Sequence, residues 1–261
     1  MYHFLKEAGY GIGNMHTPLF WDDIDEQRGL LVVDVGACDG SDWTLPAVIK
    51  RGHTVLAFEP LNTDRFMTKI RASGLESKTV LVDYKKPPGK WPLDGQVFLF
   101  AAGASDYDGT VQIHSAGELA SVIPQNFYGN SGVTSGKSVP VLRLDSVIRN
   151  QDIHILKIDT QGNELAVLRG AEALFRGGHI NMVELEFWSK GIAQGGHDPV
   201  EVLNFLHKHG FMCFDYSRNR HIPPNRPSDF EAFVASFDGN RDGGFGAWDE
   251  LICFHTLKKP Q

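Results

Sequence analysis

The stretch 31-LVVDVGACDGSDW-43 joins a run of apolar residues to a short turn of glycines and aspartates. A buried strand that ends in glycines and leads into a helix presents backbone N–H groups to a ligand. Glycine also allows a close approach to the backbone, because it carries no Cβ. Gly36 and Gly40 therefore predict a ligand-binding turn after the first strand.

Apolar runs with the length of a strand recur along the chain and alternate with helix-type patterns. These runs are continuous, which predicts parallel strands that are covered on both faces. Strands are expected at 30–35, 54–59, 79–84, 96–102, 153–159, 180–187, 211–216 and 251–255, and helices at 44–52, 62–74, 162–178 and 198–210. The alternation predicts a doubly wound α/β sheet.

The 261 residues fit a single domain, 1–261, built on one sheet. We expect an N-terminal extension over 1–29 and a hairpin excursion over 103–140, which is rich in small and polar residues. A lid-like connection is expected over 217–250, which is rich in Pro and Gly. Connections of that length are usually functional or disordered.

The composition argues against several classes of protein. A formal net charge of −7 tells against a nucleic-acid partner, because phosphate binding needs clustered Lys and Arg. No apolar run reaches the roughly 18 residues of a membrane span, and the first residues lack a secretory core. Cys38, Cys213 and Cys253 are far apart and show neither metal-type spacing nor a disulfide framework. A reduced, cytoplasmic setting is expected, and the oligomeric state stays open.

A carboxylate follows the second expected strand, in 57-AFEP-60. Ligands of open α/β sheets bind at the carboxyl ends of the strands, at the point where the strand order reverses. Glu59 would lie there, where it can accept hydrogen bonds from both hydroxyls of a ribose. Together with the first turn, Glu59 predicts a nucleoside-binding site.

The first turn also bears on which nucleoside binds. A dinucleotide site would need Gly-x-Gly-x-x-Gly, whereas this turn has Gly36 and Gly40 only, with Cys38 between them. Asp39 would repel a pyrophosphate, but it would attract a sulfonium or an α-ammonium group. These features favour S-adenosylmethionine over a dinucleotide. An ordinary strand–turn–helix without a ligand is the alternative.

The segment 157-KIDTQGNELAVLRGAEAL-174 resembles the signature of the FkbM family of S-adenosylmethionine-dependent methyltransferases. Two further blocks, 141-VLRLDSVI-148 and 101-AAGASDYDG-109, resemble the family, as do the first turn and AFEP, all in the expected order over 31–187. The resemblance implies a seven-stranded Rossmann-like methyltransferase fold, an α/β fold with a mostly parallel sheet and an antiparallel last strand. The stretch 79–95 departs from the family and is predicted as an insertion or an extra strand.

The first turn, AFEP and the resemblance together predict the residues that bind the donor. They are Asp34, Gly36, Ala37, Cys38, Asp39, Gly40, Glu59, Pro60, Ala102 and Gly103. The insertion leaves two candidates for the adenine contact: the turn at 101–104, which is favoured, and Asp83.

Methyl transfer to a hydroxyl requires alignment of the reactants and a group that helps the hydroxyl to lose its proton. Asp159 ends its expected strand at the ligand edge, Glu186 lies on the adjoining strand, and Lys157 shares a face with Asp159. These three residues are the predicted catalytic group. Asp159 would be a general base, or would hold a divalent cation with Glu186, although no residue is assigned to a metal. Alternatively, Lys157, Asp159 and Glu164 form an ion pair and a helix cap.

The predicted function is methylation of a hydroxyl group on a sugar, a glycan or a glycosylated natural product, with S-adenosylmethionine as the donor. The acceptor is thus a small molecule or a glycan. A nicotinamide-dependent oxidoreductase and a catalytically silent nucleoside-binding module are the alternatives.

Overall fold

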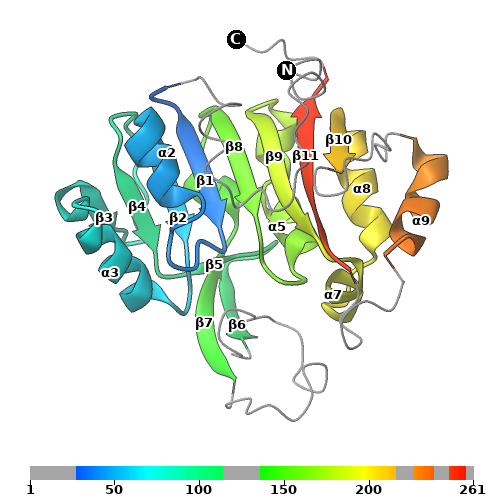
Figure 1. Ribbon diagram of the computed structural model, residues 1–261, viewed down its shortest axis with the longest axis horizontal. Helices are drawn as coiled ribbons and strands as arrows, with labels where there is room; N and C mark the ends of the chain where they lie inside the picture. Colours follow the sequence, from blue (N-terminus) through cyan, green and yellow to red (C-terminus); the bar gives the residue numbers. More distant parts are fainter. Residues whose placement is uncertain (1–27, 114–135, 216–225, 238–246, 257–261) are drawn as a thin grey trace.

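The computed structural model describes residues 28–113, 136–215, 226–237 and 247–256. At its centre is an eight-stranded sheet with the order β10-β11-β9-β8-β1-β2-β4-β3 (Figure 1). The strands are β1 (Leu31–Val35), β2 (Thr54–Phe58), β3 (Thr79–Leu81), β4 (Val97–Phe100), β8 (Ile153–Ile158), β9 (Ile180–Phe187), β10 (Phe211–Asp215) and β11 (Asp249–His255). Strand β11 runs antiparallel to β9 and β10, whereas the other pairs are parallel.

The predicted α/β sheet with an antiparallel last strand is confirmed, but the predicted number of strands is wrong. The sheet has eight strands, and the additional one is β3, which pairs with β4 at the edge. It comes from the stretch that departs from the family, predicted as an insertion or an extra strand. The number seven was taken from the family pattern, which does not include this strand.

Helices pack on both faces of the sheet (Figure 1). They are α2 (Thr44–Arg51), α3 (Thr63–Ala72), α4 (Leu144–Val147), α5 (Glu164–Gly170), α6 (Glu172–Arg176), α7 (Ser189–Gln194), α8 (Pro199–Lys208) and α9 (Pro227–Ala235), and a 3-10 turn, η2, spans Glu76–Lys78. Successive side chains of β1 point to opposite faces of the sheet. Val33 packs into the core that includes α5 and α8, and Val32 packs into the core beneath α2 and α3. None of the helices in the described ranges is long and apolar enough to cross a bilayer.

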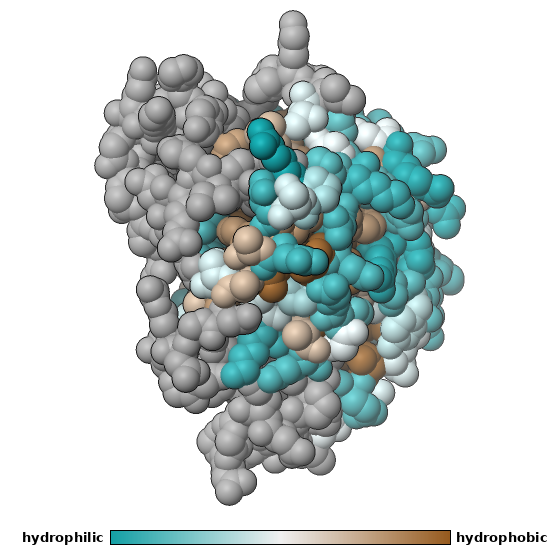
Figure 2. All heavy atoms as spheres, turned by 90° about the vertical axis from the view of Figure 1, so that its right-hand side faces the viewer, coloured by the Kyte–Doolittle hydropathy of each residue, from teal (hydrophilic) through white to brown (hydrophobic). Residues whose placement is uncertain are grey.

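The expected helix over 162–178 is divided at Ala171 into α5 and α6. Helices α7 and α9 were not expected. Helix α9 and the start of β11 fall within the predicted lid-like connection. Its parts 217–225 and 238–246 lie outside the described residues, as do 1–27 of the predicted extension. On the side of α8 and α9 the described surface is mainly hydrophilic (Figure 2), because these helices turn Val202, Leu206 and Phe230 inward.

A second, three-stranded sheet adjoins the carboxyl ends of the main strands, with the order β5-β7-β6. Its strands are β5 (Gly103–Ala104), β6 (Gly109–Ile113) and β7 (Lys137–Leu142), and Figure 1 shows β6 and β7 projecting beyond the edge of the main sheet. It occupies the described part of the predicted hairpin excursion, of which 114–135 lie outside the described residues.

The sequence showed no disulfide framework, but the structure contains one disulfide. Cys213 and Cys253 form a disulfide between directly paired positions of β10 and β11, and Cys38 is the free cysteine. The 40 residues that separate them in the sequence conceal the fact that their strands are neighbours. Disulfides persist mainly in oxidising compartments, so this bond tells against the reduced, cytoplasmic setting that we expected.

We predict that replacing both Cys213 and Cys253 by alanine lowers the free energy of unfolding by about 4 kcal/mol, the loop-closure value for a cross-link of this span. Denaturant unfolding of the variant and of a Cys38→Ala control measures the difference. Thiol counting in denaturant should find one free thiol in the unreduced protein. Three free thiols would contradict the disulfide.

Candidate active site

A cavity of about 510 Å³ lies at the carboxyl ends of β1, β2, β8 and β9. Strands β2 and β8 lie on opposite sides of β1, so the strand order reverses there, which is where ligands bind in open α/β sheets. Predicted residues that line the cavity are Gly36, Cys38, Asp39, Glu59, Pro60, Gly103, Asp159 and Glu186. Asp34, Ala37, Gly40, Ala102 and Lys157 lie behind this lining.

The first turn depends on two glycines with left-handed backbone conformations, Gly36 at φ 78° and Gly40 at φ 76°. A Cβ at Gly36 would collide with the carbonyl oxygen of Asp159, and one at Gly40 would lie 2.8 Å from the ring of Phe66. The sequence predicted a close approach to this backbone by a ligand. The structure also places other parts of the protein against both glycines, so packing is already sufficient to require them, while Gly36 still lines the cavity.

Glu59 joins two loops at this end of the cavity. Its Oε1 accepts hydrogen bonds from the backbone N–H of Leu61 and of Asn62, both at 2.7 Å, and its Oε2 accepts one from Cys38 N at 2.9 Å. Burial raises the pKa of Glu59, although these three donors oppose the shift. A carboxylate oxygen has two lone pairs, so Oε2 keeps one acceptor position for a ligand.

Asp39 is paired within the protein. Its carboxylate lies 3.3 Å from Arg65 and 3.8 Å from Lys69, both on α3, and accepts a hydrogen bond from Ser41 N. Partial burial acts to raise the pKa of Asp39, but the hydrogen bonds from Ser41 and the two cations lower it overall. Arg65, which the sequence analysis missed, also lines the cavity.

Of the two candidates for contact with the adenine, only the turn at 101–104 lies at the cavity. Gly103 and Ala104 line the cavity, and residues of β6 and β7 add an apolar wall beside them. Asp83 does not line it and instead accepts a hydrogen bond from Lys85 N. The turn at 101–104 therefore remains the candidate for contact with an adenine.

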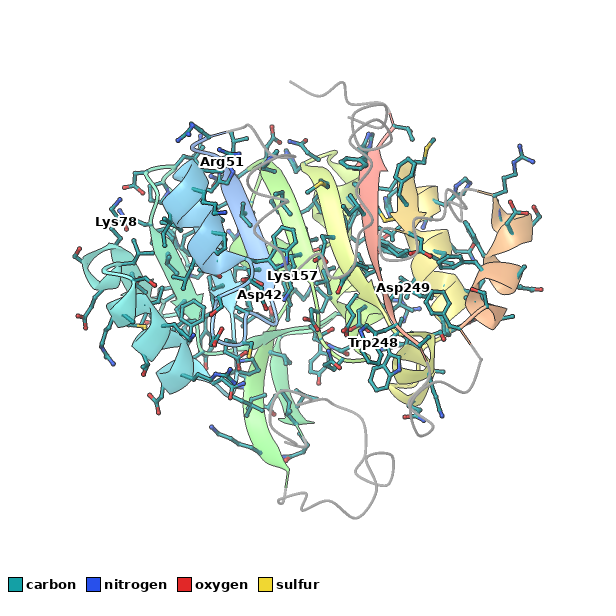
Figure 3. All side chains as sticks on the ribbon, viewed as in Figure 1. Asp42, Arg51, Lys78, Lys157, Trp248 and Asp249 are labelled. Atoms are coloured by element: carbon teal, nitrogen blue, oxygen red, sulfur yellow. A yellow bond between two sulfur atoms is a disulfide. The ribbon has the colours of Figure 1, made fainter. Side chains whose placement is uncertain are left out.

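Lys157 lies in the middle of the sheet (Figure 3) and is only 5% exposed. Its Nζ donates to the carbonyl oxygen of Gly36 at 2.8 Å and lies 3.3 Å from Asp34 and 3.6 Å from Asp159. Burial alone would lower the pKa of Lys157, but Asp34, Asp159 and Glu184 raise it above its ordinary value. Lys157 therefore stays charged behind the cavity and connects the first turn to the loop after β8.

Asp159 and Glu186 come together at the other end of the cavity. The side-chain nitrogen of Gln161, Nε2, lies 2.9 Å from Oδ1 of Asp159 and 2.7 Å from Oε2 of Glu186. Burial, followed by the charges of Asp159 and Glu250, raises the pKa of Glu186 well above its ordinary value. The sequence analysis missed Gln161 as a site residue, although it stands inside the quoted signature.

Two more buried glutamates surround this end and were also missed. Glu184 shares a face with Glu186 on β9, and Glu250 of β11 pairs directly with Glu186. Burial and then Glu250 raise the pKa of Glu184. Glu250 was not predicted as a site residue because it falls in the predicted lid-like connection. It lies near the start of β11, where Figure 3 shows its neighbours Trp248 and Asp249.

Glu164 has the structural role that the sequence left as an alternative. It is fully buried and accepts hydrogen bonds from the backbone N–H of Thr160 and of Gly162. Burial raises the pKa of Glu164 to about 7. Glu164 therefore shapes the loop that carries Asp159 and Gln161. In the described part of the chain, no group of three or more His, Cys, Asp or Glu residues is arranged to hold a metal ion.

Comparison with solved structures finds methyltransferases of low sequence identity. One is a precorrin-6y C5,15-methyltransferase from Geobacter metallireducens, with 11% identity, 90% of this chain and 86% of that chain covered, and a TM-score of 0.42. Another is StiE O-MT residues 961–1257, with 10% identity, 94% and 74% covered, and a TM-score of 0.45. A third is a putative tRNA (m1A22) methyltransferase from Streptococcus pneumoniae in complex with S-adenosyl-L-methionine, with 10% identity, 96% and 76% covered, and a TM-score of 0.39.

No curated protein matches the chain. The model of the methyltransferase FkbM domain, in contrast, matches residues 34–213, which is more than half of the sequence. The match begins at the end of β1, includes the signature after β8 and ends in β10, so it contains most of the cavity lining. The chain belongs to the FkbM methyltransferase family.

Proposed function

We propose that this methyltransferase acts on oxygen, at a hydroxyl group of a sugar, a glycan or a glycosylated natural product. The observation that carries the proposal is the division of one cavity into two chemically different ends. One end has Glu59 and backbone groups suited to a nucleoside, and the other has Asp159 and Glu186. Membership of the family favours methyl transfer over the oxidoreductase that the sequence left open.

The cofactor is S-adenosyl-L-methionine, which supplies an electrophilic methyl group on a sulfonium. The residues present fit it. Glu59 keeps a lone pair on Oε2 for a ribose hydroxyl, because backbone N–H groups use its other positions. Gly103 and Ala104, with the apolar wall from β6 and β7, suit the adenine. The donor would thus lie across the ends of β1, β2 and β4.

Asp159 is the general base in this proposal. Its side chain is 23% exposed and lines the cavity, so an acceptor hydroxyl can reach it. Lys157 and Gln161 each engage one of its oxygens, which fixes the carboxylate while leaving a lone pair to take the proton. A hydroxyl has a pKa far above neutrality, and its partial deprotonation during the reaction makes it a better nucleophile.

Incubation with isotopically labelled donor and a panel of sugars, glycans and glycosides tests the function. We expect one methyl group in the product, located on oxygen by tandem mass spectrometry. Matched acceptors in which single hydroxyls are replaced by hydrogen identify the position. Transfer to nitrogen or carbon alone, or no transfer to any acceptor, would contradict the proposal.

We predict that Glu59→Ala weakens binding of S-adenosylhomocysteine by about 10- to 100-fold, because the change removes a charged hydrogen-bond acceptor. It also leaves the backbone N–H groups of Cys38, Leu61 and Asn62 without their partner. Titration calorimetry measures the dissociation constant. Glu76→Ala, at an exposed glutamate on η2, is the matched control and should bind as the wild type does. Equal affinity in the two variants would remove Glu59 from the donor site.

We predict that Asp159→Asn lowers kcat by about 100-fold or more, the usual contribution of a general base, while the affinity for S-adenosylhomocysteine changes little. The amide keeps the shape of the side chain but cannot take the proton. Turnover with labelled donor and calorimetry separate the two effects. Asp152→Asn is the control, since Asp152 lies just before β8, at the opposite end of that strand. A variant at Asp159 with normal turnover would exclude the base role.

A further inference from the structure

Gln161 donates to two carboxylates that come from different strands. Asp159 follows β8 directly, and Glu186 lies in β9, whose Leu185 pairs with Ile158. The amide nitrogen carries two hydrogens, so each carboxylate can receive its own hydrogen bond, at 2.9 Å and 2.7 Å. Without a donor between them, two like charges at adjacent positions of neighbouring strands repel each other.

The backbone of Gln161 has a left-handed conformation, with φ 55°. Residues other than glycine rarely adopt it, and asparagine does so more readily than glutamine. Asparagine is one methylene group shorter, however, and glycine has no side chain. Asparagine and glycine therefore tolerate the left-handed backbone at position 161, but neither has a side chain long enough to bridge the two carboxylates.

The surroundings of Glu186 make the amide donor important. The strongest charge effects on Glu186 among the described residues come from three carboxylates, Asp159, Glu250 and Glu164, followed by the cation Lys157. Lys157 contacts Asp34, Asp159 and the Gly36 carbonyl. Gln161 therefore supplies Glu186 with a hydrogen bond in a region that is otherwise dominated by negative charge.

We propose that Gln161 is a positioning residue for methyl transfer, whose single amide group bridges Asp159 and Glu186 and fixes the orientation of the catalytic carboxylate toward the acceptor. The inference rests on the proposed function, because Asp159 acts as the base there. The bridge holds Oδ1 of Asp159, so that the remaining lone pairs face the cavity from a fixed direction. The orientation of an acceptor hydroxyl then depends on a residue that does not exchange a proton itself.

Two substitutions remove the bridge while suiting the backbone, Gln161→Asn and Gln161→Gly. We expect kcat to fall by about 10- to 100-fold, since a misplacement of about 1 Å in a catalytic group can cost that much. The affinity for S-adenosylhomocysteine should stay at the wild-type value, because Glu59 and its partners at the other end of the cavity are unchanged. Gln112→Asn, at an exposed position of β6, is the matched control.

A second readout needs no acceptor. Carbon-13 NMR titration of the Glu186 carboxyl group should give a higher pKa in Gln161→Asn than in the wild type. Wild-type turnover in both variants, together with an unchanged titration of Glu186, would overturn the bridge. The Asp159→Asn experiment tests the base role separately. If the wild type transfers no methyl group to oxygen, the proposed function fails. The titration then decides alone: a shift supports the bridge, and no shift overturns it.

Discussion

The buried ammonium group of Lys157 is the interaction on which the rest of the site depends. It contacts the carboxylate of Asp34 in β1, the carbonyl of Gly36 in the first turn and the carboxylate of Asp159 after β8. A buried charge without a partner is strongly destabilising, so these groups must stay together. The first turn and Asp159, the proposed base, are thereby fixed relative to each other by one side chain.

This constraint gives the two glycines of the first turn a role in packing. Gly36 allows the turn to lie against the backbone of Asp159, and Gly40 allows Phe66 of α3 to pack beneath it. Glu59 then connects the turn to the loop after β2 through the N–H groups of Cys38, Leu61 and Asn62. The end of the cavity that contains Glu59 is therefore built largely from backbone groups whose positions follow from packing.

Local patterns in the sequence were sufficient for the parts of the site that lie close to a strand end. Continuous apolar runs identified the strands, and the residues that follow them, such as Glu59 and Asp159, could be assigned to the ligand edge. The bridge through Gln161 depends on the register between β8 and β9, and Glu250 reaches Glu186 only because β11 inserts beside β9. Pairings between distant segments leave no periodic signal, and the disulfide was missed for the same reason.

The antiparallel direction of β11 determines which end of the cavity changes in this strand can affect. Because β11 begins at the ligand edge, Asp249 and Glu250, at the end of the connection from β10, lie beside Phe187 and Glu186. The Cys213–Cys253 bond fastens the stem of that connection to the sheet. Substitutions at the start of β11 would therefore alter the acid-rich end of the cavity, while the contacts of Glu59 with the first turn stay in place.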